Sequence, residues 1–243
     1  MKEPIVHDDA MTDRNLEAQP VAPPADVHAG IHRDATRERL LDVAERCFAE
    51  RGIDGTSIRE ITREAGANVA SVHYHFRDKQ GLYEAVYARR MDYLRDYRVS
   101  RIQAALARPG ITLEGFLTAF AQAFVEPLME QSTARISLTL MNREMMHPRL
   151  PPEMMRDRFM RPLADVLFSA VRQLVPSLDN RQIAECMLSM VAQLLHAVQM
   201  FNASPCSGAM LQVLPAGIGL QSHVEHIVRF THAGILAYAK EGR

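Results

Sequence analysis

The chain has 243 residues, of which 47% are hydrophobic, so it is long and apolar enough to bury a sizeable core. Its formal net charge of −1 excludes a strongly basic protein that holds nucleic acid by bulk charge, so any such contact must come from a few placed groups. The three cysteines, Cys47, Cys186 and Cys206, have no C-x-x-C spacing, which argues against a disulfide framework or a zinc site and fits a reducing compartment.

The N-terminal residues 1–32 combine four prolines with acidic residues and no sustained hydrophobic period, which predicts a disordered acidic tail. Acidic residues also stand where a signal peptide needs an apolar region. The most apolar long run, 183–201, still carries a carboxylate, an imidazole and two amides, which a bilayer span would rarely contain. We therefore expect a soluble cytoplasmic protein with no membrane partner.

From residue 34 onward the pattern becomes helical. Leu40, Leu41, Ala44 and Phe48 recur at helical spacing, and Gly52 follows them like a helix-ending glycine. Short polar residues then stand at three N-cap positions: Thr56 or Ser57 at the first, Asn68 at the second and Asp78 at the third. The helices that they would begin cover 57–65, 68–76 and about 79–105.

The rest of the chain also predicts helices and no strand alternation. Apolar residues at helical spacing indicate segments at 113–128, 133–146, 159–174, 180–203 and 221–241. The residues of 133–146 leave a strand conceivable there, and the prolines and glycines of 205–220 predict a loop. The fold class is therefore all-α.

The stretch around His73 and His75 is the most informative part of the sequence. Two residues apart on a helix, their side chains point about 200° away from each other, so they cannot share one ion. No third ligand stands nearby at zinc spacing, and no G-x-S-x-G or H-E-x-x-H motif supplies catalytic partners. We expect no metal, no cofactor, no catalytic residue and no enzymatic activity.

A surface for nucleic acid has a better geometric case. The Ala65-Gly66-Ala67 junction lets two short helices cross closely, as in a helix-turn-helix. If Val69, Val72 and Phe76 face the core, small and polar side chains remain on the open side, where they can approach base edges and phosphate oxygens. These open-side residues are Ala70, Ser71, His73 and Tyr74.

The run 36–86 resembles the DNA-binding domain of the TetR family of bacterial repressors, with "FAERG", "TSIREIT", "AGANVASVHYHF" and "DKQGL" in the family's order and spacing. The resemblance implies that Arg59 reaches a base or a phosphate and that Lys79 binds a phosphate. His73 stands where the family often has tyrosine, and a neutral imidazole donates to phosphate more weakly than its cation. The expected DNA contacts are Ser57, Arg59, Asn68, Val69, Ala70, Ser71, His73, Tyr74 and Lys79.

The C-terminal part is similar to the CecR-like branch of that family, on the strength of "NREMMHP" (142–148) and the later "RP" (161–162). The resemblance implies an inducer pocket, for which we expect Phe116, Phe120, Phe124, Met141, Arg143 and Met145, although such a stripe of phenylalanine and methionine is more often plain core. Arg143 and Glu144 would be polar groups of the pocket or an ion pair with each other.

The family's dimer interface is made by its last two long helices, which here are 180–203 and 221–241. The first of them is apolar on more than one face, so it must be buried on several sides, either by the chain's own core or by a partner chain. The expected interface residues are Met187, Val191, Leu194, Leu195, Val198, Val224, Ile227, Val228 and Ile235.

The sequence thus predicts three parts: the tail of 1–32, a helix-turn-helix DNA-binding domain of 33–80, and a helical ligand-binding and dimerisation domain of 81–243. Its expected function is a homodimeric repressor that binds a palindromic operator in double-stranded DNA and is released by an unknown small molecule. Two alternatives stay open. One is an α-helical ligand carrier or enzyme with a structural helix-turn-helix, and the other is a regulator that needs no small ligand.

Overall fold

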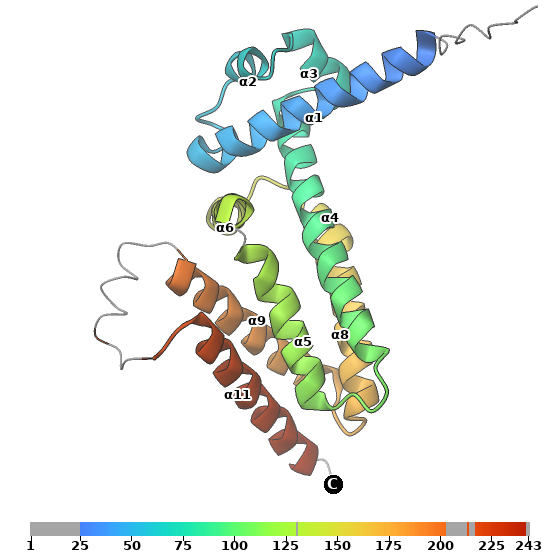
Figure 1. Ribbon diagram of the computed structural model, residues 1–243, viewed down its shortest axis with the longest axis vertical. Helices are drawn as coiled ribbons and strands as arrows, with labels where there is room; N and C mark the ends of the chain where they lie inside the picture. Colours follow the sequence, from blue (N-terminus) through green and yellow to red (C-terminus); the bar gives the residue numbers. More distant parts are fainter. Residues whose placement is uncertain (1–24, 130, 203–212, 214–216, 242–243) are drawn as a thin grey trace, which may run out of the picture. The chain divides into compact units, whose positions relative to one another are not determined.

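The computed structural model describes residues 25–129, 131–202, 213 and 217–241, and all regular secondary structure within these ranges is helical (Figure 1). The all-α class predicted from the sequence is confirmed. Two compact units make up the chain, Met1–Ala35 and Thr36–Arg243, and every contact described below lies within the second. Helix α1 (Ala25–Arg51) includes residues 25–32 of the expected tail, whose residues 1–24 lie outside the described ranges.

Helix α1 buries the face that its spacing predicted. Leu40, Leu41, Ala44 and Phe48 are all completely buried, and Gly52 follows the helix in the left-handed region with φ +72°. The buried hydroxyl of Thr56 then donates a hydrogen bond of 2.8 Å to the Gly52 carbonyl. This bond satisfies one of the carbonyl groups that the end of α1 leaves free.

Helices α2 (Ile58–Glu64) and α3 (Val69–Phe76) form the helix-turn-helix, and α4 (Lys79–Leu106) follows at once. Each predicted N-cap accepts a backbone N–H bond three residues on: Ser57 from Glu60 at 3.2 Å, Asn68 from Ser71 at 2.8 Å, and Asp78 from Gly81 at 2.7 Å. Gly66 makes the turn between α2 and α3 with φ +60°, a conformation that costs glycine little. At Gly81 a Cβ would lie 2.0 Å from the Phe76 carbonyl oxygen, so only glycine lets α4 approach α3 this closely.

The C-terminal helices pack around α4. Helix α5 (Leu113–Val125) runs beside it and continues into the short 3₁₀ helix η1 (Glu126–Leu128). Helix α6 (Gln131–Met146) covers the segment for which a strand was conceivable. Helices α9 (Asn180–Asn202) and α11 (Leu220–Glu241) lie side by side and both contact α5 (Figure 1). Most of the predicted loop 205–220 lies outside the described residues.

One helical segment differs from the sequence reading. The helix expected at 159–174 begins earlier, as α7 (Pro152–Met154), a π-helical segment η2 (Met155–Met160) and α8 (Arg161–Leu174). Pro162 has no N–H to bond the Arg158 carbonyl four residues back, and its ring would crowd that carbonyl in a regular helix. The wider π turn accommodates the ring, and the Arg158 carbonyl instead accepts a 2.9 Å bond from Arg95 of α4.

Helix α9 is the one described helix that is long and apolar enough to span a bilayer. In the structure it packs against α5, α8 and α11, and Ile183, Met190, Leu194 and Val198 are completely buried. Burial within the protein explains the apolar character at these positions, whereas Leu188 of the same helix is 63% exposed.

We expect Thr56→Val to lower the free energy of unfolding by about 1–2 kcal/mol, because it removes the buried hydroxyl that donates to the Gly52 carbonyl. Urea denaturation measures this loss. Thr118→Val is the matched control, since the Thr118 hydroxyl makes a similar 2.9 Å bond to the Glu114 carbonyl at an exposed site. The control should change stability by less than about 0.5 kcal/mol. Equal losses in the two variants would contradict the role given to the buried bond.

Candidate functional site

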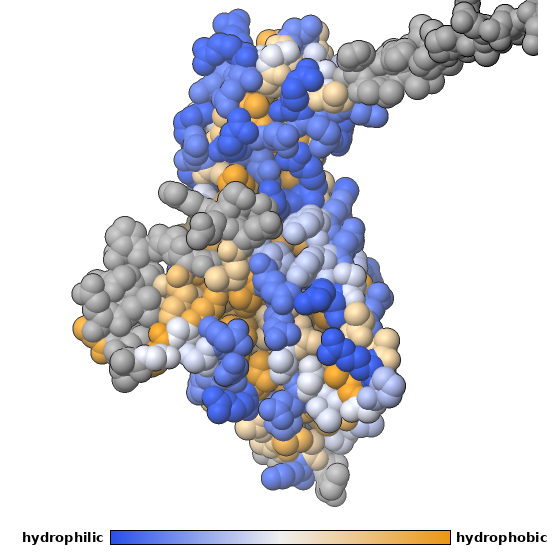
Figure 2. Space-filling model, viewed as in Figure 1, coloured by the Kyte–Doolittle hydropathy of each residue, from blue (hydrophilic) through white to orange (hydrophobic). Residues whose placement is uncertain are grey.

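Helix α3 buries one face and leaves the other open. Val72 and Phe76 are buried, as predicted, whereas Tyr74 is 68% exposed. The expectation that Val69 faces the core is wrong, because this first residue of α3 is 38% exposed. Its side chain therefore adds an apolar contact to the open face. Figure 2 shows hydrophilic residues dominating the visible surface of α1–α3, whereas hydrophobic residues gather where Figure 1 draws α9.

The N-terminal turn of α3 is held by side-chain hydrogen bonds. Asn68 Oδ1 accepts from the backbone N–H of Ser71 at 2.8 Å and from its hydroxyl at 2.9 Å. Ala70 between them is exposed. Ser57, another expected DNA contact, is exposed and caps α2 in the same way. These short side chains position the helix ends and leave the backbone accessible.

His73 is exposed, and its Nδ1 lies 2.8 Å from the carbonyl oxygen of Arg77. Arg77 is the one described residue other than glycine with a positive φ, +72°, and this conformation turns its carbonyl toward the ring. Nδ1–H must donate in this contact, so Nε2 of the neutral ring can only accept. A phosphate oxygen would therefore receive a hydrogen bond from His73 only when the ring carries both protons.

Two arginines of α2, Arg59 and Arg63, are exposed and have no ion-pair partner among the described residues. The exposed arginines Arg46 and Arg51 of α1, by contrast, pair with carboxylates of α2. Lys79 is half-buried, and its Nζ donates a 2.9 Å bond to the Thr56 carbonyl. Two ammonium protons remain for another acceptor. The α2–α3 side of the protein thus offers cations that its own carboxylates do not neutralise.

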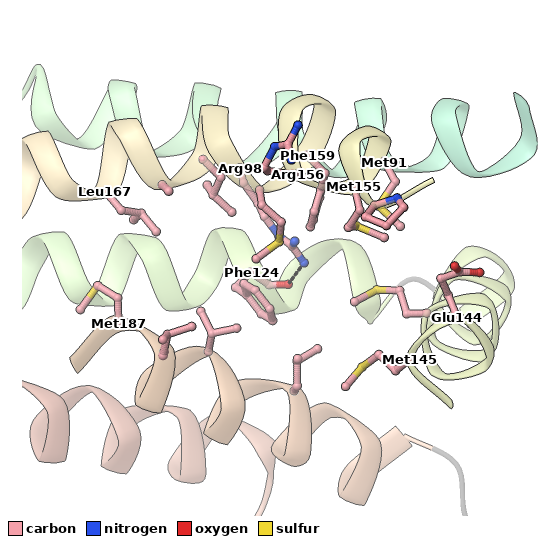
Figure 3. Close-up of a pocket in the computed structure, with 18 of the residues that line it drawn as sticks. Met91, Arg98, Phe124, Glu144, Met145, Met155, Arg156, Phe159, Leu167 and Met187 are labelled. Atoms are coloured by element: carbon pink, nitrogen blue, oxygen red, sulfur yellow. Dashed lines mark hydrogen bonds between the residues drawn. The ribbon is translucent and has the colours of Figure 1, made fainter. Parts of the chain in front are cut away.

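A cavity of about 780 Å³ opens in the C-terminal helices, between α4, α5, α6, η2, α8 and α9 (Figure 3). Its walls are mainly apolar and rich in methionine, and π turns of the kind seen in η2 often occur at functional sites. The residues that line the cavity include Arg98, Phe124, Met141, Glu144, Met145, Arg156, Phe159, Met187, Val191 and Leu195.

The residues predicted for this pocket separate into three groups. Phe124, Met141 and Met145 lie on the cavity wall. Phe116 and Phe120 do not, because they are completely buried in the core, where helical spacing alone could not distinguish wall from interior. The prediction that Phe116 and Phe120 line the pocket is therefore wrong.

Arg143 points away from the cavity. Its Nε donates to the Ala49 carbonyl at 3.0 Å and its Nη2 to the Glu50 carbonyl at 2.7 Å, so it caps the C-terminal end of α1. The ion pair considered between Arg143 and Glu144 does not form, although the structure describes both side chains. Arg143 therefore joins α6 to α1 and is not a ligand-facing group.

Glu144 borders the cavity with a carboxylate that is already satisfied. It accepts bonds of 2.7 Å from the backbone N–H groups of Arg149 and Leu150 and one of 3.0 Å from the Tyr83 hydroxyl. Burial raises the pKa of Tyr83 to about 12 and raises that of the neighbouring Tyr87 as well, so both hydroxyls stay protonated and donate. Tyr87 donates to the Leu140 carbonyl at 2.7 Å. Both tyrosines belong to α4, which is thereby fixed to α6.

Arg98 of α4 is the main residue of the cavity that the sequence reading missed. It is 1% exposed, and burial lowers the pKa of its guanidinium to about 10. The guanidinium carbon lies 3.9 Å from the centre of the Phe124 ring (Figure 3). A signal was present, since Arg98 stands four residues from both Leu94 and Ile102 on the buried face of the helix.

The residues expected at the dimer interface lie inside the single chain. Seven of them are buried within the chain's own core: Met187, Leu194, Val198, Val224, Ile227, Val228 and Ile235. Val191 and Leu195 are half-buried on the cavity wall. A partner chain could not reach the seven buried side chains, so this assignment is corrected. The large apolar residues that these helices leave exposed are Leu188, Phe230 and Leu236.

No group of three or more histidine, cysteine, aspartate or glutamate side chains comes together among the described residues as a metal site would require. His73 and His75, the two histidines considered for this role, make separate contacts with Arg77 and with the rings of Tyr74 and Phe76.

Comparison with known proteins gives the class. The family model for bacterial regulatory proteins of the tetR family matches residues 40–86. A second model, for the C-terminal domain of the HTH-type transcriptional dual regulator CecR, matches residues 113–235. Together with the exposed α3 and the cavity, these matches define a helix-turn-helix transcriptional regulator, which is not an enzyme. The chain belongs to the TetR family, and its C-terminal domain matches that of the CecR branch.

Two curated relatives each match less than a quarter of the chain. The HTH-type transcriptional regulator AcrR of Shigella flexneri is 38% identical over 52 residues, which are 21% of this chain and 24% of that protein. An HTH-type transcriptional repressor of Mycobacterium tuberculosis is 40% identical over 55 residues, or 23% of this chain and 29% of that one. This chain therefore spans less than a third of either relative's length.

The fold extends further than these alignments. The crystal structure of a TetR family transcription regulator from Marinobacter aquaeolei superposes with a TM-score of 0.61 over 84% of this chain and 97% of that one. The two sequences are 18% identical, so the likeness concerns the fold alone.

We expect Arg98→Met to raise the free energy of unfolding by about 1–3 kcal/mol, because it removes a buried charge that has no counter-charge among the described residues. The lost contact with Phe124, about 2 kcal/mol when desolvated, offsets only part of the several kcal/mol that burying an unpaired ion costs. Urea denaturation at neutral pH measures the change. Arg101→Met is the control, since Arg101 is exposed on the same helix and pairs with Glu126 at 3.1 Å. Destabilisation by Arg98→Met at neutral pH would show that the buried charge is compensated.

Proposed function

We propose that the protein is a cytoplasmic transcriptional repressor that binds a palindromic operator as a homodimer and leaves it when a small molecule enters the cavity. The observation that carries the proposal is the open face of α3, with its exposed Tyr74 beside the unpaired cations of α2. A purely structural helix-turn-helix would have no need of such a face. The relatives named above, one of them a repressor, support this sign of regulation.

The proposed DNA contacts come from a helix-turn-helix domain of residues 33–80. Helix α3 enters the major groove with Val69, Ala70 and Tyr74 toward the bases, and Arg59 of α2 contacts base or phosphate. Ser57, Asn68 and Ser71 present their helix N-termini to phosphates, where backbone N–H groups favour an anion. Lys79 and doubly protonated His73 complete the phosphate contacts.

The proposed homodimer uses the outer sides of α9 and α11. Phe230 is 61% exposed on α11, and Leu236 lies further along the same helix. Large apolar side chains exposed on adjacent helices are typical of an interface that a second chain covers. A two-fold axis would present two α3 helices to two half-sites, which is how a palindromic operator is read.

The proposed release of DNA acts through α4 and α6. Helix α6 borders the cavity with Met141, Met145 and Glu144, and the adjacent Arg143 caps α1. Helix α4 begins directly after α3 and carries Tyr83, which is bonded to Glu144. A ligand that shifts either helix therefore shifts the helix-turn-helix. It must favour the released state by several kcal/mol to move the equilibrium decisively.

We expect Arg59→Ala to weaken binding of labelled DNA from the region next to the protein's own gene by about 1–3 kcal/mol, because it removes an unpaired cation. Fluorescence anisotropy at two salt concentrations measures this loss. Arg108→Ala removes the same charge from an exposed site beyond the other end of α4 and should leave affinity unchanged. Equal affinity for operator and random DNA, or equal loss in both variants, would count against the proposed surface.

The dimer has its own test. Phe230→Glu places a charge in the proposed apolar contact and should shift the molar mass in light scattering from twice 27.3 kDa toward 27.3 kDa. Met146→Glu is the control, because Met146 is 74% exposed but belongs to α6, which the proposed interface does not use. A dimer that survives Phe230→Glu intact would mean that a different surface joins the two chains.

A further inference from the structure

Arg98 differs from the other arginines of its helix. Helix α4 carries five arginines, and four of them pair with carboxylates: Arg89 and Arg90 with Glu45, Arg95 with Asp92, and Arg101 with Glu126. Arg98 is the most buried of the five, yet it forms no ion pair among the described residues. Its Nε has no hydrogen-bond partner, and its Nη2 makes one long contact of 3.4 Å with the Phe124 carbonyl.

A buried guanidinium without an anion is costly, and this one lies on the wall of a cavity of about 780 Å³. The other charged groups on the described walls are already engaged. Glu144 accepts three hydrogen bonds, and the exposed Arg156 pairs with Asp157 at 2.7 Å. The unused hydrogen-bonding capacity of the cavity is therefore concentrated on Arg98.

We propose that the cavity binds an amphipathic organic monoanion, with an apolar body against the methionine-rich walls and one carboxylate on Arg98. This inference rests on the proposed function, because it names the chemical class of the effector for that cavity. The volume suits a ligand of drug or lipid size. One free cation balances one negative charge, whereas a phosphate dianion would bring a second charge into an apolar site with nothing to neutralise it.

The orientation of Arg98 suits a carboxylate. The guanidinium carbon lies over the Phe124 ring, 3.9 Å from its centre, and 5.8 Å from the centre of the Phe159 ring, so two aromatic rings lie beside the group and offer it no hydrogen-bond acceptor. The N–H donors lie in that plane and point to its edge. A carboxylate can therefore form two parallel bonds there without displacing either ring. Figure 3 shows Arg98 reaching from α4 toward Phe124 between the cavity walls.

Arg98 also connects the proposed ligand site to the helix-turn-helix through α4. Arg98 belongs to α4, the helix that begins at Lys79 directly after α3. A carboxylate bound to Arg98 weakens the contact with the Phe124 carbonyl of α5 and changes the forces between these two helices. The carboxylate also neutralises the buried guanidinium, and this gain in free energy stabilises the ligand-bound conformation.

The test uses a neutral fluorescent probe, N-phenyl-1-naphthylamine, which brightens in apolar sites and reports that the cavity is folded and accessible. The protein contains no tryptophan, so protein background is low. Sodium decanoate and 1-decanol then compete with the probe, because they share a chain and differ in charge. Wild type, Arg98→Met, Arg98→Lys and the control Arg101→Met are compared at neutral pH.

We expect Arg98→Met to bind the probe normally and to lose decanoate affinity by about tenfold or more, while 1-decanol competes as in wild type. Arg98→Lys should recover part of the loss because it keeps the charge without the fork, and Arg101→Met should match wild type. Unchanged decanoate affinity in Arg98→Met, or no displacement of the probe by decanoate from wild type, would overturn the proposal.

The two proposals fail separately. Decanoate binding is measured without DNA, so its absence would leave the DNA-binding proposal intact. If decanoate binds through Arg98 but does not release labelled operator DNA, the chemistry of the site stands and the proposed ligand release fails.

Discussion

The buried carboxylate of Glu144 is the contact on which the arrangement of the second unit depends. A buried charge is tolerated only when its hydrogen-bonding capacity is filled, and here two backbone N–H groups and the Tyr83 hydroxyl fill it. These bonds fix the loop after α6 and the first turns of α4 to one point. Arg143, the preceding residue, extends the same turn of α6 to the carbonyl groups at the end of α1. One turn of helix thus connects the cavity wall with the elements that carry α3.

Local rules succeeded where the determining atoms are close in sequence. The N-caps Ser57, Asn68 and Asp78 and the turn at Gly66 could be predicted because each depends on a contact within about three residues. The family resemblance likewise rests on fifty consecutive residues around these signals. The proposed DNA contacts follow from the same segment.

The cavity could not be predicted in the same way. Phe116, Phe120 and Phe124 share one helical stripe, but only tertiary packing decides that the third borders a cavity and the first two fill the core. Helix α9 shows the same difficulty in reverse. Its apolar residues serve the core on one side and the cavity on another, with Met187 and Val191 on the wall, so a pattern that suggested an interface has two internal explanations. The sequence shows Arg98 as a charged residue on an apolar helix face, but a role in ligand binding can be inferred only once the cavity beside it is known.

The π-helical segment η2 has a consequence for how this protein can diverge. A π turn holds one residue more than an α turn, so losing a single residue between 155 and 160 keeps α7 and α8 in phase when Pro162 is also replaced by a residue that has a backbone N–H. The same deletion within α8 would rotate every later residue by about 100° and take Leu167 and Val171 out of the core. The chain length of this part of the cavity wall can therefore change during evolution while the surrounding helices keep their packing. Related chains can in this way bind different effectors and retain the same fold.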